Sequence, residues 1–522
     1  MKTKKITLMV ITLIMAITFF SVPASADAAS KPAKATIKTC KAVGNDTVAV
    51  TWKKVKKSAG YELVVNGEDT YDFDAKTLSA DVTDLESSTT YTFKVRAYKN
   101  SKQKQWLNTN TGEYQSKKPN KVHCGESKTV TTRVYGKYSV AKKATTGIKI
   151  TREDLGATLI NQMIGQNNKS DFSKGGFTWD TERKTIGWTY YNGLMIQSFI
   201  NAGELGYADE FYNDNINEDG SIKGYRDGEL DAVAPSRGLF YLLDSENADK
   251  YMKAIQFTFT KLEAQNEVPD CGGNVNHKQK ADGTPTANWL AYPVALDGLY
   301  MSLPFLMECG NAIEAGKISL YYADGTEVMA DELYDIVFSR IAWMYENLKE
   351  GDLLMHGYNP ESGKTNGQCW SRGEGWYCMC VADVIEMMPV SEYASNLTII
   401  LEDVLAGLIN YQDESGLWYN VPNYGAELEG NRLEVSGTAM FAYAMLKGYN
   451  GGYLTDSIFA ESAIKALDGI ADIATVEDGN ISIGSIYKAS SVAAQPDGYC
   501  TQPFVANEAK GIGPVIMALL EA

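Results

Sequence analysis

From Thr151 to the end of the chain, apolar residues recur at three- and four-residue spacing in one segment after another. This spacing is typical of amphipathic helices, and roughly 370 residues of it without alternating strands predict an all-α domain built from helix hairpins. The sequence shows no clear βαβ unit and no Gly-rich phosphate-binding loop. The expected helices are 155–164, 194–203, 236–243, 248–262, 296–305, 331–348, 378–388, 397–411, 437–447 and 462–473.

Residues 31–147 have a different character. β-branched and aromatic runs at 47–52, 61–65 and 90–98 are separated by turn signals, which predicts a small β-sandwich. The stretch from 99 to 123 is unusually long, and it leaves the last strand, near 138–140, uncertain. The pattern of Trp52, Tyr61, Leu85, Tyr91 and Val95 resembles the fibronectin type III family, which implies a tryptophan packed in the core. We assign this module no catalysis, and a glycan or cell-surface contact is its candidate role.

The first 26 residues predict a secretory signal peptide. Lysines precede an apolar run at 6–20, and small residues follow at 24–26. The run is too short to span a bilayer, and no later stretch is long enough. We therefore expect a secreted or cell-surface protein without a membrane span. The net charge of −16 argues against a nucleic-acid partner.

The chain has eight cysteines and three histidines, which limits the kinds of metal site that it could form. With so few histidines a structural zinc cluster is not expected, and we predict no metal site. We also predict no cofactor. Cys40 and Cys124 both fall in the N-terminal region of a chain expected to be secreted, so they could pair. Cys369, Cys378 and Cys380 lie in apolar surroundings, where buried thiols are the expected state.

Asp297 is the first candidate for catalysis, because it interrupts an apolar run over 296–305. A buried carboxylate is costly unless it is paired, hydrogen-bonded or protonated. A proton-donating catalyst needs the protonated form. The structural alternative is that Asp297 caps the following helix. Asp231 also lies at an expected helix start, and the same alternative applies to it.

Further candidates lie where helices are expected to start or end. Trp370, Arg372 and Trp376 flank two glycines that we expect to let the backbone turn tightly. Indole faces beside a guanidinium suit an anionic sugar, although the same residues could form a stack that only closes a loop. Tyr190 lies among aromatic residues before an early helix. His277, Lys278 and His356 complete the set, and singly each histidine is more often structural.

Seven pieces of the catalytic region occur in the order of a known family. They are Trp188, Tyr190 and Gly193; Gly272, Gly273, His277 and Lys278; residues 296–301 with Pro304 and Phe305; His356; Trp370, Arg372, Gly373, Gly375 and Trp376; residues 436–440; and Asn507, Glu508 and residues 511–514. Together they resemble the unsaturated rhamnogalacturonyl hydrolases, glycoside hydrolase family 105, and more distantly the unsaturated glucuronyl hydrolases. The resemblance implies an (α/α)6 barrel over 150–522, with its site among the loops at one end.

By this resemblance Asp297 is the general acid/base and Asp231 the second carboxylate, which holds a sugar hydroxyl. One departure is that Ala295 stands where the family usually has tryptophan, and Trp289 is a possible replacement. The residues implied to bind substrate are Tyr190, His277, Lys278, His356, Trp370, Arg372, Trp376 and Asn507.

The implied substrate is an oligosaccharide that a polysaccharide lyase has left with a 4,5-unsaturated uronic acid at its non-reducing end. Hydration of the C4=C5 bond would release that sugar, with Asp297 protonating C4. We expect burial and a neighbouring Asp231 to raise the pKa of Asp297. The alternatives are an unsaturated glucuronyl hydrolase acting on other uronides, an ordinary inverting glycosidase, and a non-catalytic glycan-binding surface protein.

Overall fold

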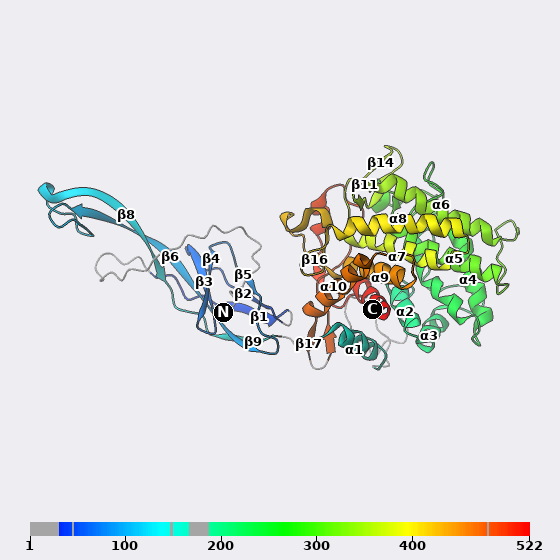
Figure 1. Ribbon diagram of the computed structural model, residues 1–522, viewed down its shortest axis with the longest axis horizontal. Helices are drawn as coiled ribbons and strands as arrows, with labels where there is room; N and C mark the ends of the chain where they lie inside the picture. Colours follow the sequence, from blue (N-terminus) through cyan, green and yellow to red (C-terminus); the bar gives the residue numbers. More distant parts are fainter. Residues whose placement is uncertain (1–30, 44–45, 147–149, 166–186, 478–479) are drawn as a thin grey trace. The chain divides into compact units, whose positions relative to one another are not determined.

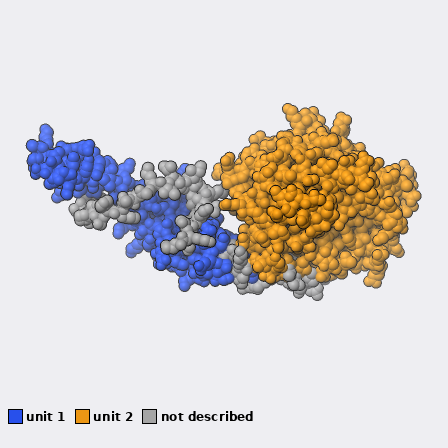
Figure 2. Space-filling model, viewed as in Figure 1, with its two compact units in different colours: residues 1–149, 474–476 blue, residues 150–473, 477–522 orange. Residues whose placement is uncertain are grey.

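The computed structural model describes residues 31–43, 46–146, 150–165, 187–477 and 480–522. The chain forms two compact units, residues 1–149 with 474–476 and residues 150–473 with 477–522 (Figure 2). The predicted signal peptide, 1–26, lies outside the described residues. Among the described helices, none combines the length and the apolar character needed to cross a membrane.

The first unit is a β-sandwich of two antiparallel sheets. One sheet has the order β1-β2-β5. The other has the order β4-β3-β6, with β7, β8 and β9 also pairing with β6. The strands are β1 (Ile37–Ala42), β2 (Val48–Trp52), β3 (Gly60–Val65), β4 (Asp69–Asp74), β5 (Ser79–Val82), β6 (Thr90–Asn108), β7 (Glu113–Gln115), β8 (Cys124–Tyr135) and β9 (Lys142–Thr145), with a short 3-10 helix, η1 (Lys121–His123), before β8.

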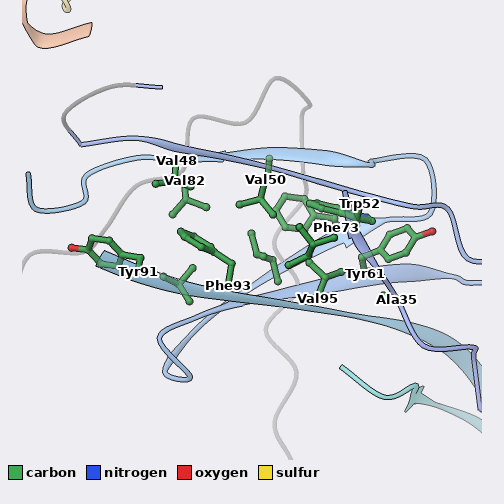
Figure 3. Packing of buried hydrophobic residues seen from close by; sticks show 14 of the residues in the cluster. Ala35, Val48, Val50, Trp52, Tyr61, Phe73, Val82, Tyr91, Phe93 and Val95 are labelled. Atoms are coloured by element: carbon green, nitrogen blue, oxygen red, sulfur yellow. The ribbon is translucent and has the colours of Figure 1, made fainter. Parts of the chain in front are cut away.

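Trp52 lies in the core between these sheets, as the sequence predicts (Figure 3). Its ring lies 5.7 Å from that of Tyr61 and 5.4 Å from that of Phe73, measured between centroids. Alternate residues of β2 are buried, because successive side chains of a strand point to opposite faces. The fibronectin-like expectation for this unit is confirmed.

The long stretch after residue 99 forms a β-ribbon. β6 has 19 residues and continues beyond the sandwich, where it pairs with β8 from Tyr98↔Tyr135 to Asn108↔Cys124 (Figure 1). Residues 138–140 are not a strand, and β9 at Lys142–Thr145 pairs with the start of β6. Cys40 and Cys124 lie on different strands, and both are free thiols rather than a disulfide.

The second unit is an (α/α)6 barrel, also as predicted. Six elements form a closed inner ring in the order α2, η4, α5, α7, α9 and α11, and α11 packs against α2 to close it. Outside them, α3, α4, α6, α8, α10 and α1 pack in turn against these six. The helices are α1 (Arg152–Gly165), α2 (Tyr190–Asn201), α3 (Leu205–Asn215), η3 (Leu230–Ala232), η4 (Ala234–Leu242), α4 (Ala248–Glu263), η5 (Ala287–Trp289), α5 (Asp297–Glu314), α6 (Ala330–Leu348), α7 (Ser371–Met387), α8 (Ser391–Ile409), η6 (Pro422–Glu427), α9 (Val435–Asn450), α10 (Ser457–Ile473), η7 (Pro496–Cys500) and α11 (Ala509–Glu521).

Short strands lie in the loops of this unit. β10 pairs with β13, which also pairs with β14, and the remaining pairs are β11 with β12, β15 with β16, β17 with β18, and β19 with β20. Their bounds are β10 (Val294–Ala295), β11 (Lys349–Glu350), β12 (Leu353–Leu354), β13 (Gly357–Asn359), β14 (Lys364–Thr365), β15 (Trp418–Tyr419), β16 (Leu433–Glu434), β17 (Thr475–Glu477), β18 (Asn480–Ser482), β19 (Ile486–Tyr487) and β20 (Phe504–Val505).

The expected tight turn around Gly373 and Gly375 is wrong, because both glycines lie in the first turns of α7. They serve close packing instead. A Cβ at Gly375 would lie 2.7 Å from the Met440 sulfur on α9, so a side chain there would separate two inner helices. Helix α7 therefore begins at Ser371, seven residues before the predicted start.

Three other helices differ from expectation. The segment predicted as a helix over 236–243 is the 3-10 helix η4, with Pro235 near its start. A Cβ at Gly238 would lie 2.1 Å from the Tyr212 hydroxyl oxygen, which shows how closely η4 approaches α3. Helices α3 and α11 were not predicted. In α11, Gly511, Gly513 and Pro514 are weak helix formers, and buried tertiary packing overrides that preference.

Candidate active site

Backbone hydrogen bonds between distant loops draw the candidate residues together at the start of the inner helices. Leu230 donates its N–H to the carbonyl of His277 (3.1 Å), and His277 donates to Pro293 (2.8 Å). Leu296 donates to the carbonyl of His356 (3.1 Å). Each of these residues is a candidate or lies within a few positions of one. The site is therefore built on the backbone framework that joins these loops.

Asp297 and His356 form the centre of this group. Oδ2 of Asp297 lies 2.8 Å from Nε2 of His356, and Nδ1 of His356 lies 2.7 Å from the Tyr499 hydroxyl. His356 is fully buried, whereas 14% of the Asp297 side chain is exposed. The N-cap of α5 is Leu296, and Asp297 is the first residue of the helix, so the capping alternative is wrong. Asp297 is a carboxyl group that reaches solvent on one side and is fixed by an imidazole on the other.

The expected rise in the pKa of Asp297 is also wrong. Burial raises this pKa, but the charge of His356 and its hydrogen bond outweigh burial and hold the pKa below its ordinary value. Asp231 acts in the direction that we expected, as a like charge that raises the pKa, and its contribution is smaller. In the substrate-free site Asp297 is accordingly a carboxylate paired with an imidazole.

Asp231 lies in η3 and forms a second charged group. Its Oδ1 lies 3.3 Å from Nε2 of His277, and its Oδ2 lies 2.5 Å from Nζ of Lys278. Lys278 also lies 3.2 Å from Glu229. Burial raises the pKa of Asp231, but His277 and Lys278 hold it well below the ordinary value. The Trp289 ring packs against the His277 ring at a tilt of 41°, with centroids 4.0 Å apart, so the indole that we considered a replacement contacts a site residue.

Trp370 connects Arg372 with the central pair. The Arg372 guanidinium lies 4.6 Å from the Trp370 ring centroid, and the His356 ring lies 5.0 Å from the same indole. Arg372 is buried, and its Nη1 donates to the Ser436 hydroxyl (3.0 Å) and to the Tyr487 carbonyl (2.6 Å). Part of its hydrogen-bonding capacity thus joins α7 to the start of α9 and to β19. Its role in binding a uronate stays a prediction.

The phenol of Tyr190 is within electrostatic reach of both carboxylates. Its ring packs edge-to-face on Trp376 at 6.2 Å, and Tyr300 also packs against that indole, with centroids 4.9 Å apart. Burial raises the pKa of Tyr190 well above its ordinary value, and the charges of Asp231 and Asp297 raise it further. The phenol is therefore neutral and can donate a hydrogen bond to a sugar or a carboxylate.

Asn507 is placed differently from the other candidates. It has a positive φ of 58°, its Nδ2 donates to the Ser482 hydroxyl (2.9 Å), and its Oδ1 accepts from the Ile483 N–H (2.8 Å). Its side chain thus fixes the loop after β18. Its substrate-binding role stays a prediction without a contact to the carboxylates.

Several site residues were missed from the sequence. Tyr499 holds His356 but lies in the short helix η7, where no motif marks it. Glu229 stands two residues before Asp231, and this pair of neighbouring carboxylates in the sequence could have marked it as a site residue. Lys510 was also missed. It forms a buried ion pair at 2.5 Å with Glu508, which the family resemblance already included, and it lies 5.6 Å from the Tyr191 ring centroid. Burial lowers the pKa of Lys510, and the charge of Arg372 lowers it further, so this pair borders the site.

Residues 159–522 match the family model described as Glycosyl Hydrolase Family 88. The chain belongs to this family. Residues 32–110 match the fibronectin type III domain. The family 88 match covers more than half of the chain, so the second unit is a glycoside hydrolase.

This family 88 hydrolase is also similar in sequence to individual proteins. The chain is 33% identical over 205 residues to the 24.9 kDa protein in the picA locus of Rhizobium radiobacter, covering 33% of this chain and 82% of that protein. It is 25% identical over 231 residues to the unsaturated rhamnogalacturonyl hydrolase YesR of Bacillus subtilis, covering 43% of this chain and 58% of that protein.

Two solved structures share the fold. A family 105 glycoside hydrolase of C. acetobutylicum superposes with a TM-score of 0.57 at 25% identity, covering 70% of this chain and 98% of that one. A possible family 105 member from Klebsiella pneumoniae gives 0.56 at 20% identity, covering 71% and 93%. The family resemblance expected from the sequence is thus confirmed.

Proposed function

We propose that this family 88 hydrolase removes a 4,5-unsaturated uronic acid from the non-reducing end of lyase-generated oligosaccharides of the rhamnogalacturonan type. The observation that carries the proposal is the hydrogen bond of 2.8 Å between Asp297 and the buried His356, at a position where the carboxyl group still reaches solvent. The B. subtilis relative YesR, an unsaturated rhamnogalacturonyl hydrolase, supports the choice of substrate class.

The chemistry needs one proton donor and one activated water. The C4=C5 bond of the unsaturated sugar is an enol ether, so a proton added to C4 leaves an oxocarbenium-like cation. Water adds at C5, the carboxylate that Asp297 has become accepts the proton of that water, and the hemiketal opens to release the neighbouring sugar. The proton is returned to the enzyme, so the cycle closes with one water consumed.

The low pKa of Asp297 in the free site defines how its proton must be supplied. The 2.8 Å hydrogen bond from Asp297 to Nε2 of His356 fixes the carboxyl group while the substrate binds. A substrate carboxylate close to Asp297 would raise the pKa of Asp297, since like charges disfavour ionisation. We propose that binding of the anionic sugar favours the protonated form of Asp297, so the acid forms only when substrate is present.

The surrounding groups suit such a sugar. Lys278 is partly exposed and offers a positive charge beside Asp231, which can accept a hydrogen bond from a sugar hydroxyl. Tyr190, Trp370 and Trp376 supply a neutral phenol and two indole faces for the rings. Neutral and cationic groups thus adjoin each of the two carboxylates.

Loss of ultraviolet absorbance tests the proposal. Hydration removes the conjugated double bond of the uronate, so the absorbance of a lyase-generated rhamnogalacturonan disaccharide should decay with enzyme. Release of the neighbouring sugar with the absorbance intact would instead indicate an ordinary inverting glycosidase. Faster decay with unsaturated glycosaminoglycan disaccharides would assign the glucuronyl alternative.

A methyl group at residue 373 should slow this reaction indirectly, by displacing His356. A Cβ added at Gly373 would lie 3.0 Å from Cδ2 of His356, so Gly373→Ala should displace the imidazole that holds Asp297. We expect kcat to fall by about 10²-fold, as for roughly 1 Å misplacements elsewhere. Gly206→Ala in α3 is the control, because nothing lies within 4 Å of its Cβ. Equal kcat for the two variants would show that His356 need not be held in place.

We also propose that the protein is secreted, with residues 1–26 as its signal peptide. The support is the run of apolar residues at 6–20 between lysines and the small residues at 24–26. N-terminal sequencing of the protein from the culture medium should begin near residue 27. Recovery of the uncleaved chain inside the cells would contradict the proposal.

A further inference from the structure

The β-ribbon of the first unit carries a charge opposite to that of the whole chain. We define the ribbon as residues 99–137, which include the outer part of β6, β7 and β8. It contains eight lysines and Arg133 against two acidic residues, Glu113 and Glu126, and so has a net charge of +7. Because the whole chain carries −16, the remaining residues carry −23. Such a concentration of one sign on one element indicates a surface for a partner of the other sign.

The register of the ribbon places several of these groups on a single face. Lys102 pairs with Thr131, Lys104 with Thr129, and Trp106 with Ser127. Alternate residues of a strand share a face, and directly paired residues of antiparallel strands lie side by side. We call this the basic face, and its members are Lys102, Lys104, Trp106, Ser127, Thr129 and Thr131.

The two lysines of the basic face are available for a partner. Both are exposed, and Nζ of Lys104 lies 5.7 Å from the half-buried Trp106 ring. Among the described residues beside the basic face, acidic groups lie only at its two ends. Arg133 is paired with Asp72 at 2.6 Å where the ribbon leaves the sandwich, and Glu113 pairs in register with Asn108 near the tip.

The opposite face of the ribbon is already neutralised in part. Lys128 lies 3.8 Å from the Tyr114 ring centroid, and the Tyr114 hydroxyl donates to Glu126 at 2.6 Å. A cation, an aromatic ring and a carboxylate there satisfy one another within the ribbon. The basic face also has lysines and an aromatic ring, but no carboxylate lies beside them between the two ends of the face.

We propose that the basic face binds an acidic polysaccharide, a polymer of carboxylate-bearing sugars. Side chains two residues apart on a strand are about 6.7 Å apart, so Lys102 and Lys104 form a regular row of cations that can meet successive carboxylates. Trp106 offers an indole face for a sugar ring, and the hydroxyls of Thr129 and Thr131 can bond sugar hydroxyls. The module would hold the enzyme on the polymer from which its substrates are cut.

The chemistry of the face favours a polysaccharide over a lipid surface. A membrane-binding element needs a broad apolar surface beside its lysines, whereas this face combines one indole with threonine and serine hydroxyls. The choice of a uronate polymer as probe rests on the proposed function. The binding itself does not, because the basic face belongs to the first unit and the carboxylates of the active site to the second.

Affinity electrophoresis of the full chain in native gels containing polygalacturonate tests the inference. The ribbon variant is Lys102→Ser with Lys104→Ser. The matched control is Lys53→Ser with Lys54→Ser, which removes the same charge from two exposed lysines of the sandwich. Trp106→Ala tests the stacking without a change of charge, and dextran replaces polygalacturonate as the neutral polymer.

We expect polygalacturonate to retard the wild type and dextran not to. Retardation should weaken at least fivefold in the ribbon variant and in Trp106→Ala, change less than twofold in the control, and decrease as salt rises. All variants should keep the wild-type rate on an unsaturated disaccharide, so failure of binding and failure of catalysis are distinguishable. No retardation of the wild type, equal losses in ribbon variant and control, an unaffected Trp106→Ala, or stronger binding to duplex DNA or anionic vesicles would overturn the proposal.

Discussion

Replacement of Asp297 by Asn should abolish most turnover of a 4,5-unsaturated disaccharide while leaving binding nearly intact. The amide keeps the shape of the carboxyl group and can still bond His356, but it cannot donate a proton to C4 or accept one from water. General acid/base groups contribute about 10²- to 10⁴-fold, and a single group used in both steps should lie at the upper end. The absorbance decay gives kcat, and calorimetric titration of the variant gives the dissociation constant.

The control for this variant is Asp335→Asn. Asp335 is an exposed carboxylate on the outer helix α6 that accepts a hydrogen bond from Tyr393, and the change should leave kcat within twofold of wild type. An Asp297→Asn enzyme that keeps a tenth of the wild-type rate would remove Asp297 from the role of acid. A variant that loses substrate affinity in the same proportion as kcat would assign Asp297 to binding.

Replacement of Asp383 by Ala should destabilise the barrel by about 3–5 kcal/mol, the usual cost of removing one partner from a buried ion pair. Asp383 lies in α7, fully buried, with Arg237 Nη1 of η4 at 2.5 Å and the Tyr443 hydroxyl of α9 at 2.7 Å. Without it, Arg237 would remain as a buried charge without its close partner, although Glu308 lies 4.0 Å away. Urea unfolding of the second unit, followed by tryptophan fluorescence, measures the loss.

The matched control and the pH dependence make this prediction specific. Asp403→Ala breaks a pair with Lys349 at 2.6 Å whose carboxylate side chain is 45% exposed, and it should cost no more than about 1 kcal/mol. Burial raises the pKa of Asp383, but Arg237 and Lys447 outweigh burial and hold it below the ordinary value. A lowered folded-state pKa adds stability above the unfolded pKa of roughly 4, and that stability is lost as the pH falls further.

The difference in stability between wild type and Asp383→Ala should therefore be full at neutral pH and should shrink below about pH 4. A difference that does not change with pH would mean that packing, rather than charge, makes Asp383 important. A loss no larger than that of Asp403→Ala would mean that water reaches Arg237 in the variant.

The architecture could be predicted because its signals are local. Helical periodicity after Thr151 and strand patterns before it reflect which face of each segment is buried, and both predictions hold. The boundaries were less accurate where packing opposes local preference. The start of α7 was missed because Gly373 and Gly375 usually favour turns, whereas here they allow close approach to His356 and Met440.

The identities of the candidate residues were also available from the sequence, whereas their pairings were not. His356 and Asp297 are 59 positions apart, and Tyr499 is a further 143 positions from His356. Their contacts depend on how loops between different helices meet at one end of the barrel. The lowered pKa of Asp297 follows from such a contact, which is why an argument from burial and the neighbouring Asp231 alone gave the wrong direction.

Local patterns of residue type were enough to predict the two modules, the helical barrel, the family and the set of residues available for catalysis. The pairing of charged groups required the folded chain: Asp297 with His356, Asp231 with Lys278, and Arg237 with Asp383. Electrostatic interactions depend on distance in space and on exclusion of water. Neither quantity is set until the inner ring closes.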